Sequence, residues 1–392
     1  MELSKVAETV NESVTLAVTD RAKELKAQGI DIISFGAGEP DFDTPDFIKA
    51  AAKQALDNGA TKYAPAAGVM DLRQEIARKL KTENNLDYSP KQVVVTCGAK
   101  HAVYLALHAL IDPGDEVLIP KPYWVSYPEM VKLVGGVPKF ADSSPENCYK
   151  LTAATLKKQL TSKTKAIIIN SPNNPGGFCY TPEELATLGK VIADFQAAVI
   201  SDEIYEYLVF NDQHFASFAA VCPELYERTI TINGLSKAYS MTGWRIGYLA
   251  APLELAKAVS RLQSHMTSGT ATFNQLAAIS ALQNGQAEVK KMREEFNKRA
   301  HLIYERLNEI PGFECQKLTG AFYAFPKVSA CYAKLKVSGS VEFCQLLLEK
   351  AQVACVPGLD FGCDENIRLS FATSREQINK GIDRIKKFIE NS

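Results

Sequence analysis

The sequence predicts an α/β fold, with a large domain built on a mostly parallel sheet and a smaller α+β domain packed against it. The chain has 392 residues, which is enough for two domains. From about residue 45, helical periodicity alternates with short β-branched runs, which is typical of a parallel sheet covered by helices. After Pro252 the pattern changes to long helical segments followed by a few short strands.

The sheet is expected to contain six apolar runs, most of them preceded by an amphipathic stretch. They are Val93–Thr96, Glu116–Pro120, Ala166–Asn170, Ala198–Asp202, Thr229–Asn233 and Arg245–Ala250. Continuous apolar runs of this length indicate strands that are buried on both faces.

Helices are predicted for most of the remaining chain. Their ranges are Leu253–Thr267, Thr272–Gln283, Gln286–Glu309, Ser340–Lys350 and Arg375–Asn391, with short strands over Ala321–Pro326 and Ile367–Phe371. We expect an N-terminal arm and part of the small domain over residues 1–44, the large domain over 45–285 and the small C-terminal domain over 286–392.

The composition excludes several classes of partner. Hydrophobic residues make up 46% of the chain, and no run approaches the roughly 18 apolar residues of a spanning helix, so no membrane partner is expected. The 44 basic and 45 acidic residues nearly cancel, which gives no broad case for nucleic acid. Nine cysteines without a C-x-x-C pair, and a start without a secretory signal, indicate reduced thiols and a cytoplasmic location. We expect no metal.

A candidate reactive amine follows one predicted strand. Lys237 lies in Gly234-Leu-Ser-Lys-Ala-Tyr-Ser-Met-Thr-Gly-Trp-Arg245, where small neighbours leave room for a bulky ring. Burial beside the cation of Arg245 would lower the pKa of this amine toward the range in which it is nucleophilic. A lone lysine on a polar turn would instead be an ordinary surface residue.

Polar residues also follow two other strands. Asp202 ends one of them and is followed by Tyr205, and Asn174 lies in the loop Ser171–Gly177. Ligands of α/β proteins bind at the carboxyl ends of strands. Taken alone, Asp202 is also compatible with a helix N-cap and the loop with plain turn chemistry, in which Asn174-Pro175 is a candidate cis bond.

A candidate anion site follows the first strand. Thr96-Cys-Gly98-Ala99-Lys100 gives a strand, a glycine turn and a helix start, and backbone N–H groups in this arrangement can bind phosphate. Many such turns hold no ligand. Trp124, one of two tryptophans, lies in a polar loop broken by prolines and could stack on a ring or be a core aromatic.

Arg368 lies within an apolar strand, where an unpaired charge is costly. A substrate carboxylate would pair with it bidentately and orient the substrate, and a structural salt bridge is the alternative. Near the N-terminus, Gly36-x-Gly38 lacks the third glycine of a dinucleotide loop and runs into Pro40, so a dinucleotide site is not favoured.

Together these segments resemble the class I aminotransferases of fold type I, which depend on pyridoxal 5'-phosphate (PLP), and most closely the bacterial-type branch of aspartate aminotransferases. The similar motifs occur in the family's order over residues 34–374. They are G-E-P-D-F, Y-A-P-A-A-G, C-G-A-K, Y-W-V-S-Y-P, S-P-N-N-P-G-G, S-D-E-I-Y, the Lys237 segment and I-R-L-S-F-A-T-S. The resemblance implies PLP as cofactor, a seven-stranded sheet and a homodimer with active sites shared between subunits.

The resemblance also implies a role for each candidate residue. Lys237 would carry the cofactor and move the substrate's Cα proton, Asp202 would pair with the pyridine nitrogen, and Tyr205 would donate to the ring's phenolate oxygen. The other expected contacts are Gly98, Ala99, Lys100, Ser236, Arg245 and the neighbouring subunit's counterpart of Tyr63 at the phosphate, Trp124 and Asn174 at the ring, and Gly38, Lys100, Trp124, Asn174 and Arg368 at the substrate.

Departures within the family bear on the substrate. The eukaryotic-like branch places an arginine that reads the substrate side chain in the segment corresponding to Gln263–Met266, and this chain has none there. Lys100, Ser13 and Thr15 match polar contacts of the bacterial branch, in which the lysine helps to bind a distal carboxylate. We therefore expect ping-pong transfer of the amino group between L-aspartate, or a related amino acid, and 2-oxoglutarate. Aromatic amino acids, prephenate and alanine are the alternative substrates.

The sequence disfavours two other functions that the same scaffold could carry. A lyase or decarboxylase is disfavoured because a carboxylate clamp at Arg368 would orient Cα–H, and not the carboxylate, for cleavage. A PLP-binding transcription regulator would carry a winged helix of about 70 residues, whereas only about 40 precede the G-E-P-D-F loop.

Overall fold

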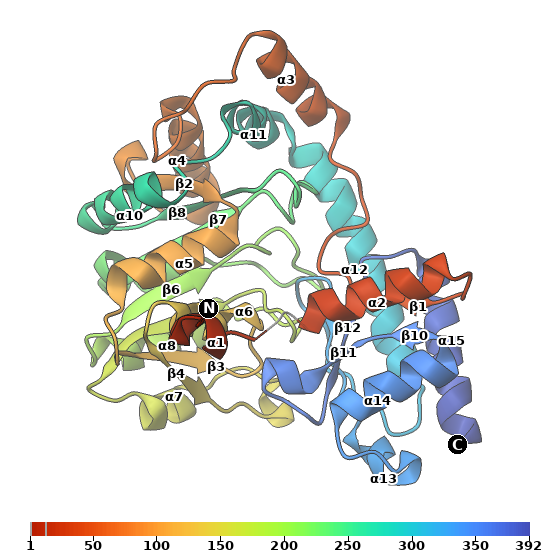
Figure 1. Cartoon of the computed structure of the whole chain (residues 1–392). Helices are drawn as coiled ribbons and strands as arrows, with labels where there is room; N and C mark the ends of the chain where they lie inside the picture. The colour runs from red at the N-terminus through yellow and green to blue at the C-terminus, as the bar shows by residue number, and fades with distance from the viewer. Residues whose placement is uncertain (1, 12–13) are drawn as a thin grey trace.

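A computed structural model describes residues 2–11 and 14–392 of the chain (Figure 1). Its larger lobe contains a seven-stranded sheet in the order β2-β8-β7-β6-β5-β3-β4. Strand β8 runs antiparallel to both β2 and β7, and the other neighbouring strands are parallel. The predicted α/β class with a mostly parallel seven-stranded sheet is confirmed.

Six strands of this sheet match the predicted apolar runs within two residues at either end. The seven are β2 (Val93–Cys97), β3 (Glu116–Pro120), β4 (Val137–Ala141), β5 (Thr164–Asn170), β6 (Ala198–Asp202), β7 (Thr229–Gly234) and β8 (Ile246–Ala250). Strand β4 was not among the predicted runs. It is an edge strand with Pro138 inside it and alternating exposure, so it lacks the continuous apolar run that identifies a central strand.

Helices cover both faces of the sheet because successive strand side chains point to opposite sides. One face packs on α5 (Ala99–Leu110), α6 (Ser126–Leu133) and α10 (Leu253–Met266). The other packs on α7 (Ala153–Gln159), α8 (Pro182–Ala193) and α9 (Phe218–Val221), and, at the β2–β8 end, on α3 (Asp46–Asp57), α4 (Met70–Asn84) and α11 (Thr272–Asn284).

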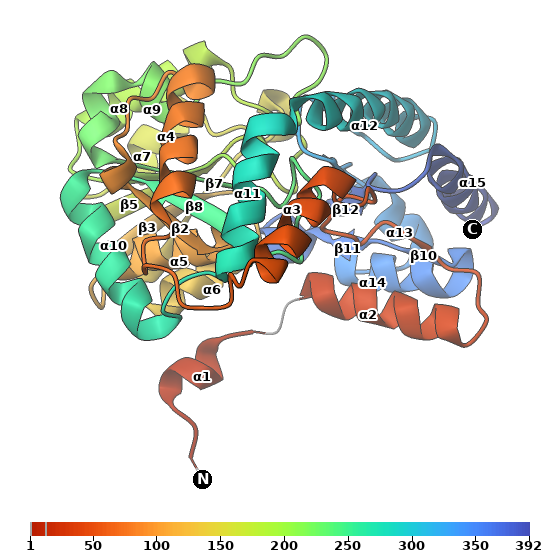
Figure 2. The ribbon, with the colours of Figure 1, turned by 90° about the horizontal axis from the view of Figure 1, so that it is seen from above.

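The smaller lobe combines helices with two short sheets (Figure 1). Its helices are α2 (Val14–Ala27), α12 (Gln286–Asn308), α13 (Tyr332–Leu335), α14 (Ser340–Leu346) and α15 (Arg375–Asn391). Its strands are β1 (Ile33–Ser34) paired with β10 (Val353–Ala354), and β11 (Val356–Pro357), β12 (Ile367–Ser370) and β9 (Tyr323–Ala324) in one sheet. The β1–β10 pair builds the N-terminal segment into this lobe, while α1 (Lys5–Thr9) projects from the body of the chain (Figure 2).

Two predicted elements of this lobe differ from those observed. The strand expected over Ala321–Pro326 is regular only at Tyr323–Ala324, and the helix expected over Ser340–Lys350 continues as a π-helical turn over Leu347–Ala351. Across both lobes, short 3₁₀ turns lie at Pro90–Gln92, Pro145–Asn147, Pro223–Arg228, Ser329–Cys331 and Gly358–Phe361. Within the described residues, no helix combines the length and the apolar character needed to cross a bilayer.

Candidate active site

A cavity of about 480 Å³ opens where β5, β6 and β7 end. It gathers residues from both lobes, including two from α2, Asp20 and Lys23. The predicted site residues that line it are Gly38, Ala99, Lys100, Trp124, Asn174, Asp202, Tyr205, Ser236, Lys237, Arg245 and Arg368. Residues up to about 350 positions apart in the sequence therefore meet in one place, at the carboxyl ends of the strands, where α/β proteins bind ligands.

Lys237 lies half-buried just beyond β7. Its Nζ donates a hydrogen bond to the backbone carbonyl of Gly38. Burial lowers the pKa of Lys237 to about 8, and the cations of Arg368 and Arg245 act in the same direction while the Glu39 carboxylate opposes them. An appreciable fraction of this amine is therefore unprotonated slightly above neutral pH, as a nucleophile or proton acceptor requires.

Asp202 ends β6 with 3% of its surface exposed. The Tyr127 hydroxyl donates to its Oδ2 at 2.6 Å, and the Ile204 N–H donates to its Oδ1 at 3.2 Å. Burial raises the pKa of Asp202, and these two donors partly offset that effect. No lysine or arginine of the described residues lies within 4.0 Å of this carboxylate, so it can accept a cation supplied by a ligand.

Two further polar side chains, those of Tyr205 and Asn174, line the same cavity as Asp202. Tyr205 Oη lies 3.0 Å from Tyr323 Oη, and burial raises the pKa of Tyr205 well above its usual value, so its phenol remains a hydrogen-bond donor. Asn174 follows β5, and its backbone N–H donates to Asn170 Oδ1 at 2.9 Å. The Asn174–Pro175 bond is cis, as the sequence allowed.

Arg368 lies on β12 with 1% of its surface exposed. Its Nη1 donates to Asn174 Oδ1 at 3.1 Å and its Nη2 to the Gly36 carbonyl at 3.0 Å. The guanidinium carbon lies 4.6 Å from the centre of the Tyr323 ring, and Nε has no hydrogen-bond partner in the part of the chain that the structure describes. Among the described residues no carboxylate lies within 4.0 Å, so the alternative of a structural salt bridge is not found there, and the cation can accept a carboxylate from a ligand.

The glycine turn before α5 lies against Arg245. Gly98 has a φ of +84°, and a Cβ there would lie 2.6 Å from Arg245 Nη2. A Cβ on Gly247 would lie 2.2 Å from the Ala99 nitrogen, so only glycine allows this approach. The start of a 12-residue helix, the Arg245 guanidinium and the buried Ser236 thus form an environment that suits an anion.

Lys100 and Trp124 line the same cavity as a pair. Lys100 Nζ lies 4.8 Å from the centre of the Trp124 ring, and burial together with Arg245 lowers the pKa of Lys100. The Trp124 ring meets the Tyr127 ring edge to face at 5.3 Å. An aromatic wall with a cation beside it can bind a flat ring and a second anionic group.

The cavity fits the cofactor that the resemblance implies. Asp202 offers a buried carboxylate for a protonated ring nitrogen, and Arg245 with the α5 start offers positive charge for a phosphate. Lys237 lies in the same cavity as both. Within the described chain, no three histidine, cysteine, aspartate or glutamate side chains lie close enough to hold a metal ion.

Two predicted residues do not line the cavity, a third lies outside the described residues, and of a fourth only the backbone is described. Tyr63 is 94% exposed, and Gly98 lies behind Arg245. Ser13 falls outside the described residues, and Thr15 lies in the first turn of α2.

Sequence reasoning missed three residues that complete the site, Tyr127, Asn170 and Tyr323. Tyr127 lies within the Y-W-V-S-Y-P motif, which offered a signal for it, and Asn170 ends a predicted strand, as Asp202 does. No sequence signal links Tyr323 to Tyr205, because the two residues are 118 positions apart.

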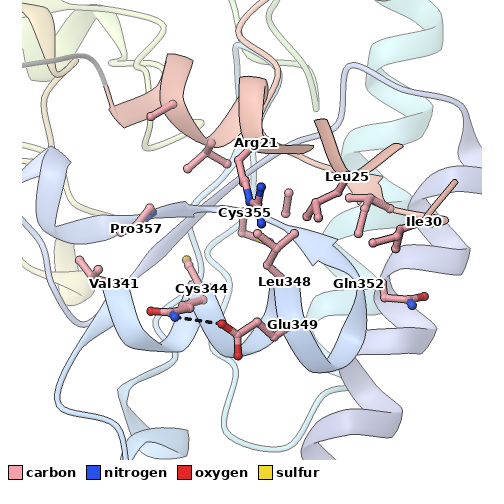
Figure 3. A pocket seen from close by; sticks show the side chains of 15 residues that line it. Arg21, Leu25, Ile30, Val341, Cys344, Leu348, Glu349, Gln352, Cys355 and Pro357 are labelled. Atoms are coloured by element: carbon pink, nitrogen blue, oxygen red, sulfur yellow. Dashed lines mark hydrogen bonds between the residues drawn. The ribbon is translucent and has the colours of Figure 1, made fainter. Parts of the chain in front are cut away.

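A second hollow of about 600 Å³ lies within the smaller lobe, between α2 and the segment from α14 to β11, and contains none of the predicted site residues (Figure 3). Leu25 and Leu348 face it from opposite sides, with Arg21 above and Glu349 below. It shares no lining residue with the first cavity, although α2 borders both.

Known proteins match this chain over nearly its full length. The family model described as aminotransferase class I and II matches residues 30–385. The aspartate aminotransferase of Geobacillus stearothermophilus is 48% identical over 390 residues, covering 100% of this chain and 99% of its own. The aspartate/prephenate aminotransferase of Cereibacter sphaeroides is 46% identical over 392 residues, or 98% of each chain. The solved structure of the aspartate aminotransferase from Thermus thermophilus with maleate has a TM-score of 0.94 at 40% identity and covers 99% of both chains.

Proposed function

Because this chain belongs to the class I and II aminotransferases, which depend on PLP, we propose that it moves the amino group between L-aspartate and 2-oxoglutarate at the cavity around Lys237. The observation that carries the proposal is the buried Arg368, which has no carboxylate partner among the described residues and shares one cavity with the amine of Lys237 and the acid Asp202. The α-carboxylate of an amino acid can pair with Arg368, and the cationic ring nitrogen of PLP can pair with Asp202.

The cofactor would be held at both ends. Asp202, fixed by the Tyr127 hydroxyl and the Ile204 N–H, would pair with the ring nitrogen. The turn at Gly98 with Ala99 and Lys100, together with Ser236 and Arg245, would hold the phosphate. When bound, PLP supplies an electron-accepting ring that stabilises negative charge on the substrate's Cα.

The chain's own residues would bind the substrate and move its proton. Arg368 would bind the α-carboxylate and so restrict rotation about the bonds of Cα. The Lys237 Nζ, unprotonated in part near its pKa of about 8, would accept the Cα proton and later return it. Tyr205, whose phenol stays protonated, and Asn174 would donate to the ring's oxygen, and Trp124 would stack on the ring.

The preference for aspartate rests on the mouth of the cavity. Lys100 places a cation there, beside Trp124, where a second carboxylate of the substrate can reach it. The relatives named as aspartate aminotransferases support this reading, and the relative named as an aspartate/prephenate aminotransferase keeps prephenate as a second acceptor. Aromatic amino acids and alanine remain alternative donors.

We also propose a homodimer in which Tyr63 reaches the phosphate of the partner's site. Tyr63 is 94% exposed in the single chain, which supports this proposal, because the tyrosine of this family motif contacts the neighbouring subunit and must therefore lie on the surface of its own chain. Arg245, at the phosphate end of the cavity, is exposed as well, so a residue of a second subunit could reach it.

We propose that the protein is cytoplasmic, and its nine cysteines, all free in the structure, support this. We keep the domain boundaries at residues 1–44, 45–285 and 286–392.

The test is a coupled assay on purified, PLP-loaded protein. Oxaloacetate and glutamate formed in equal amounts from aspartate and 2-oxoglutarate would support the proposal, and Asp202→Asn should bind PLP more weakly and lower kcat. Release of CO₂ or ammonia without amino transfer would instead indicate a lyase. Faster turnover of alanine or phenylalanine than of aspartate would overturn the substrate assignment.

A further inference from the structure

A buried charged cluster lies behind the catalytic cavity and lines no part of it. Lys79 on α4 is 1% exposed, Glu206 is 6% exposed and Asn84 is 4% exposed. Lys79 Nζ forms an ion pair with the Glu206 carboxylate and donates to Asn84 Oδ1 at 2.7 Å. Asn84 Nδ2 in turn donates to Glu206 Oε2 at 2.8 Å, so the three side chains close a ring of hydrogen bonds.

This cluster fixes the position of the chain directly after Tyr205, a residue of the site. Glu206 directly follows Tyr205, and the turn is tight because the Glu206 N–H donates to the Glu203 carbonyl at 2.9 Å and the Leu208 N–H to the Tyr205 carbonyl at 2.8 Å. Helix α4 thus holds the backbone of Tyr205 from the side away from the cavity.

From Tyr205 the contact continues into the substrate site. The Tyr205 hydroxyl lies 3.0 Å from the Tyr323 hydroxyl, and the Tyr323 ring lies 4.6 Å from the guanidinium carbon of Arg368. A shift of the turn at Glu206 would therefore move the phenol of Tyr205 and, through it, the Tyr323 ring that packs against the Arg368 guanidinium.

Stability does not account for the charges. Removing two charges from water has a large desolvation penalty that their attraction only roughly offsets, and apolar replacements of similar volume are often equally stable. A buried ion pair does, however, fix one geometry, because misplacing either charge leaves it uncompensated. The Lys79–Glu206 pair therefore suits a positioning role better than a stabilising one.

We propose that Lys79, Asn84 and Glu206 are positioning residues that set the place of Tyr205 and, through Tyr323, of Arg368. None of the three lines the cavity around Lys237. The inference rests on the proposed function of the cavity and adds a group of residues on which its geometry depends.

The test removes both charges together, because Lys79→Met alone would leave a buried, unpaired carboxylate and could prevent folding. The variant Lys79→Met/Glu206→Gln keeps the side-chain volumes and should melt within a few degrees of the parent. We expect kcat/KM for aspartate to fall about tenfold or more, because small misplacements of reacting groups are costly. Exposed Lys81 on the same helix, paired with Asp87 at 3.0 Å, gives the matched control, and Lys81→Met should leave all values unchanged.

Coupling to Tyr205 separates positioning from a general structural effect. In a Tyr205→Phe background, the double substitution should have little further effect on kcat/KM or on PLP affinity measured by equilibrium dialysis. Multiplying losses, or a folded double variant with parental kinetics and PLP affinity, would overturn the inference. Glu206→Asp, which keeps the charge but shortens the side chain, should show the same coupling to Tyr205 and serves if the double variant does not fold.

Failure of the inference differs from failure of the proposed function. If the parent itself transfers no amino group from aspartate, the proposed function fails. If the parent is active and the coupling to Tyr205 is absent, only the positioning role fails.

Discussion

Replacing Arg368 with leucine should remove the anchor for the substrate's α-carboxylate. The guanidinium is buried, has no carboxylate partner within the described chain and keeps Nε free of any hydrogen bond. A bound carboxylate would accept two charge-assisted hydrogen bonds, each contributing about 1.5–3 kcal/mol. The sum, about 3–6 kcal/mol, corresponds to a loss of roughly two to four orders of magnitude in kcat/KM for aspartate at about 1.36 kcal/mol per tenfold change.

The assay compares two substrates that differ only in the group read by Arg368. β-Alanine is aspartate without its α-carboxylate, so the parent and Arg368→Leu should use it equally slowly. Arg368→Lys keeps the charge but loses the fork geometry, and its loss should fall between the two. Arg261→Leu, at an exposed arginine on α10, is the control for removal of a surface charge.

A loss of less than about tenfold for aspartate in Arg368→Leu, with PLP binding and melting temperature preserved, would refute the assignment of Arg368 to the α-carboxylate. An equal loss for β-alanine would show that the substitution damages the site in general. Only a loss specific to the α-carboxylate agrees with the geometry of the cavity.

Three further predictions concern the amine, the mouth of the cavity and the subunit interface. In PLP-free protein, Lys237→Met should raise the free energy of unfolding at pH 7 by about 3 kcal/mol, because the native pKa of about 8 lies below the unfolded value of about 10.5. Between pH 8 and 10.5 the unfolded chain holds a proton on Lys237 that the native chain has lost, so the extra stability of the variant should decrease as the pH rises through this range. Urea titrations at several pH values measure this, and an increase in stability that does not depend on pH would contradict the pKa of about 8. Lys100→Ala should lower kcat/KM for aspartate more than for alanine, and equal losses would contradict a distal-carboxylate role. Tyr63→Phe should weaken PLP binding in dialysis without changing the melting temperature, and unchanged affinity would remove Tyr63 from the phosphate site.

The strands could be predicted because most of them are buried on both faces. The runs Ala198–Asp202 and Glu116–Pro120 match the observed strands at both ends, and their central residues are buried, as their apolar composition indicated. Strand β4 could not be found in this way, because an exposed edge strand with an internal proline does not contain such a run.

That the candidate site residues meet in one cavity was largely predictable, because several of them stand at strand ends. Asp202 and Lys237 each follow an apolar run, so parallel pairing brings them to one edge of the sheet. The long-range polar contacts behind them were not predictable, although the Y-W-V-S-Y-P motif indicated Tyr127 itself. Tyr127 meets Asp202 from 75 positions away and Lys79 meets Glu206 from 127, and such contacts depend on how helices pack and not on any local pattern.

Whether the Lys237 amine holds PLP can be tested by reduction of the purified, PLP-loaded protein with borohydride followed by peptide mass spectrometry. We expect a reduced pyridoxyl phosphate group on the peptide that contains Lys237 and on no other. A label on Lys100 or another lysine, or no label on a protein that still transfers amino groups, would contradict it.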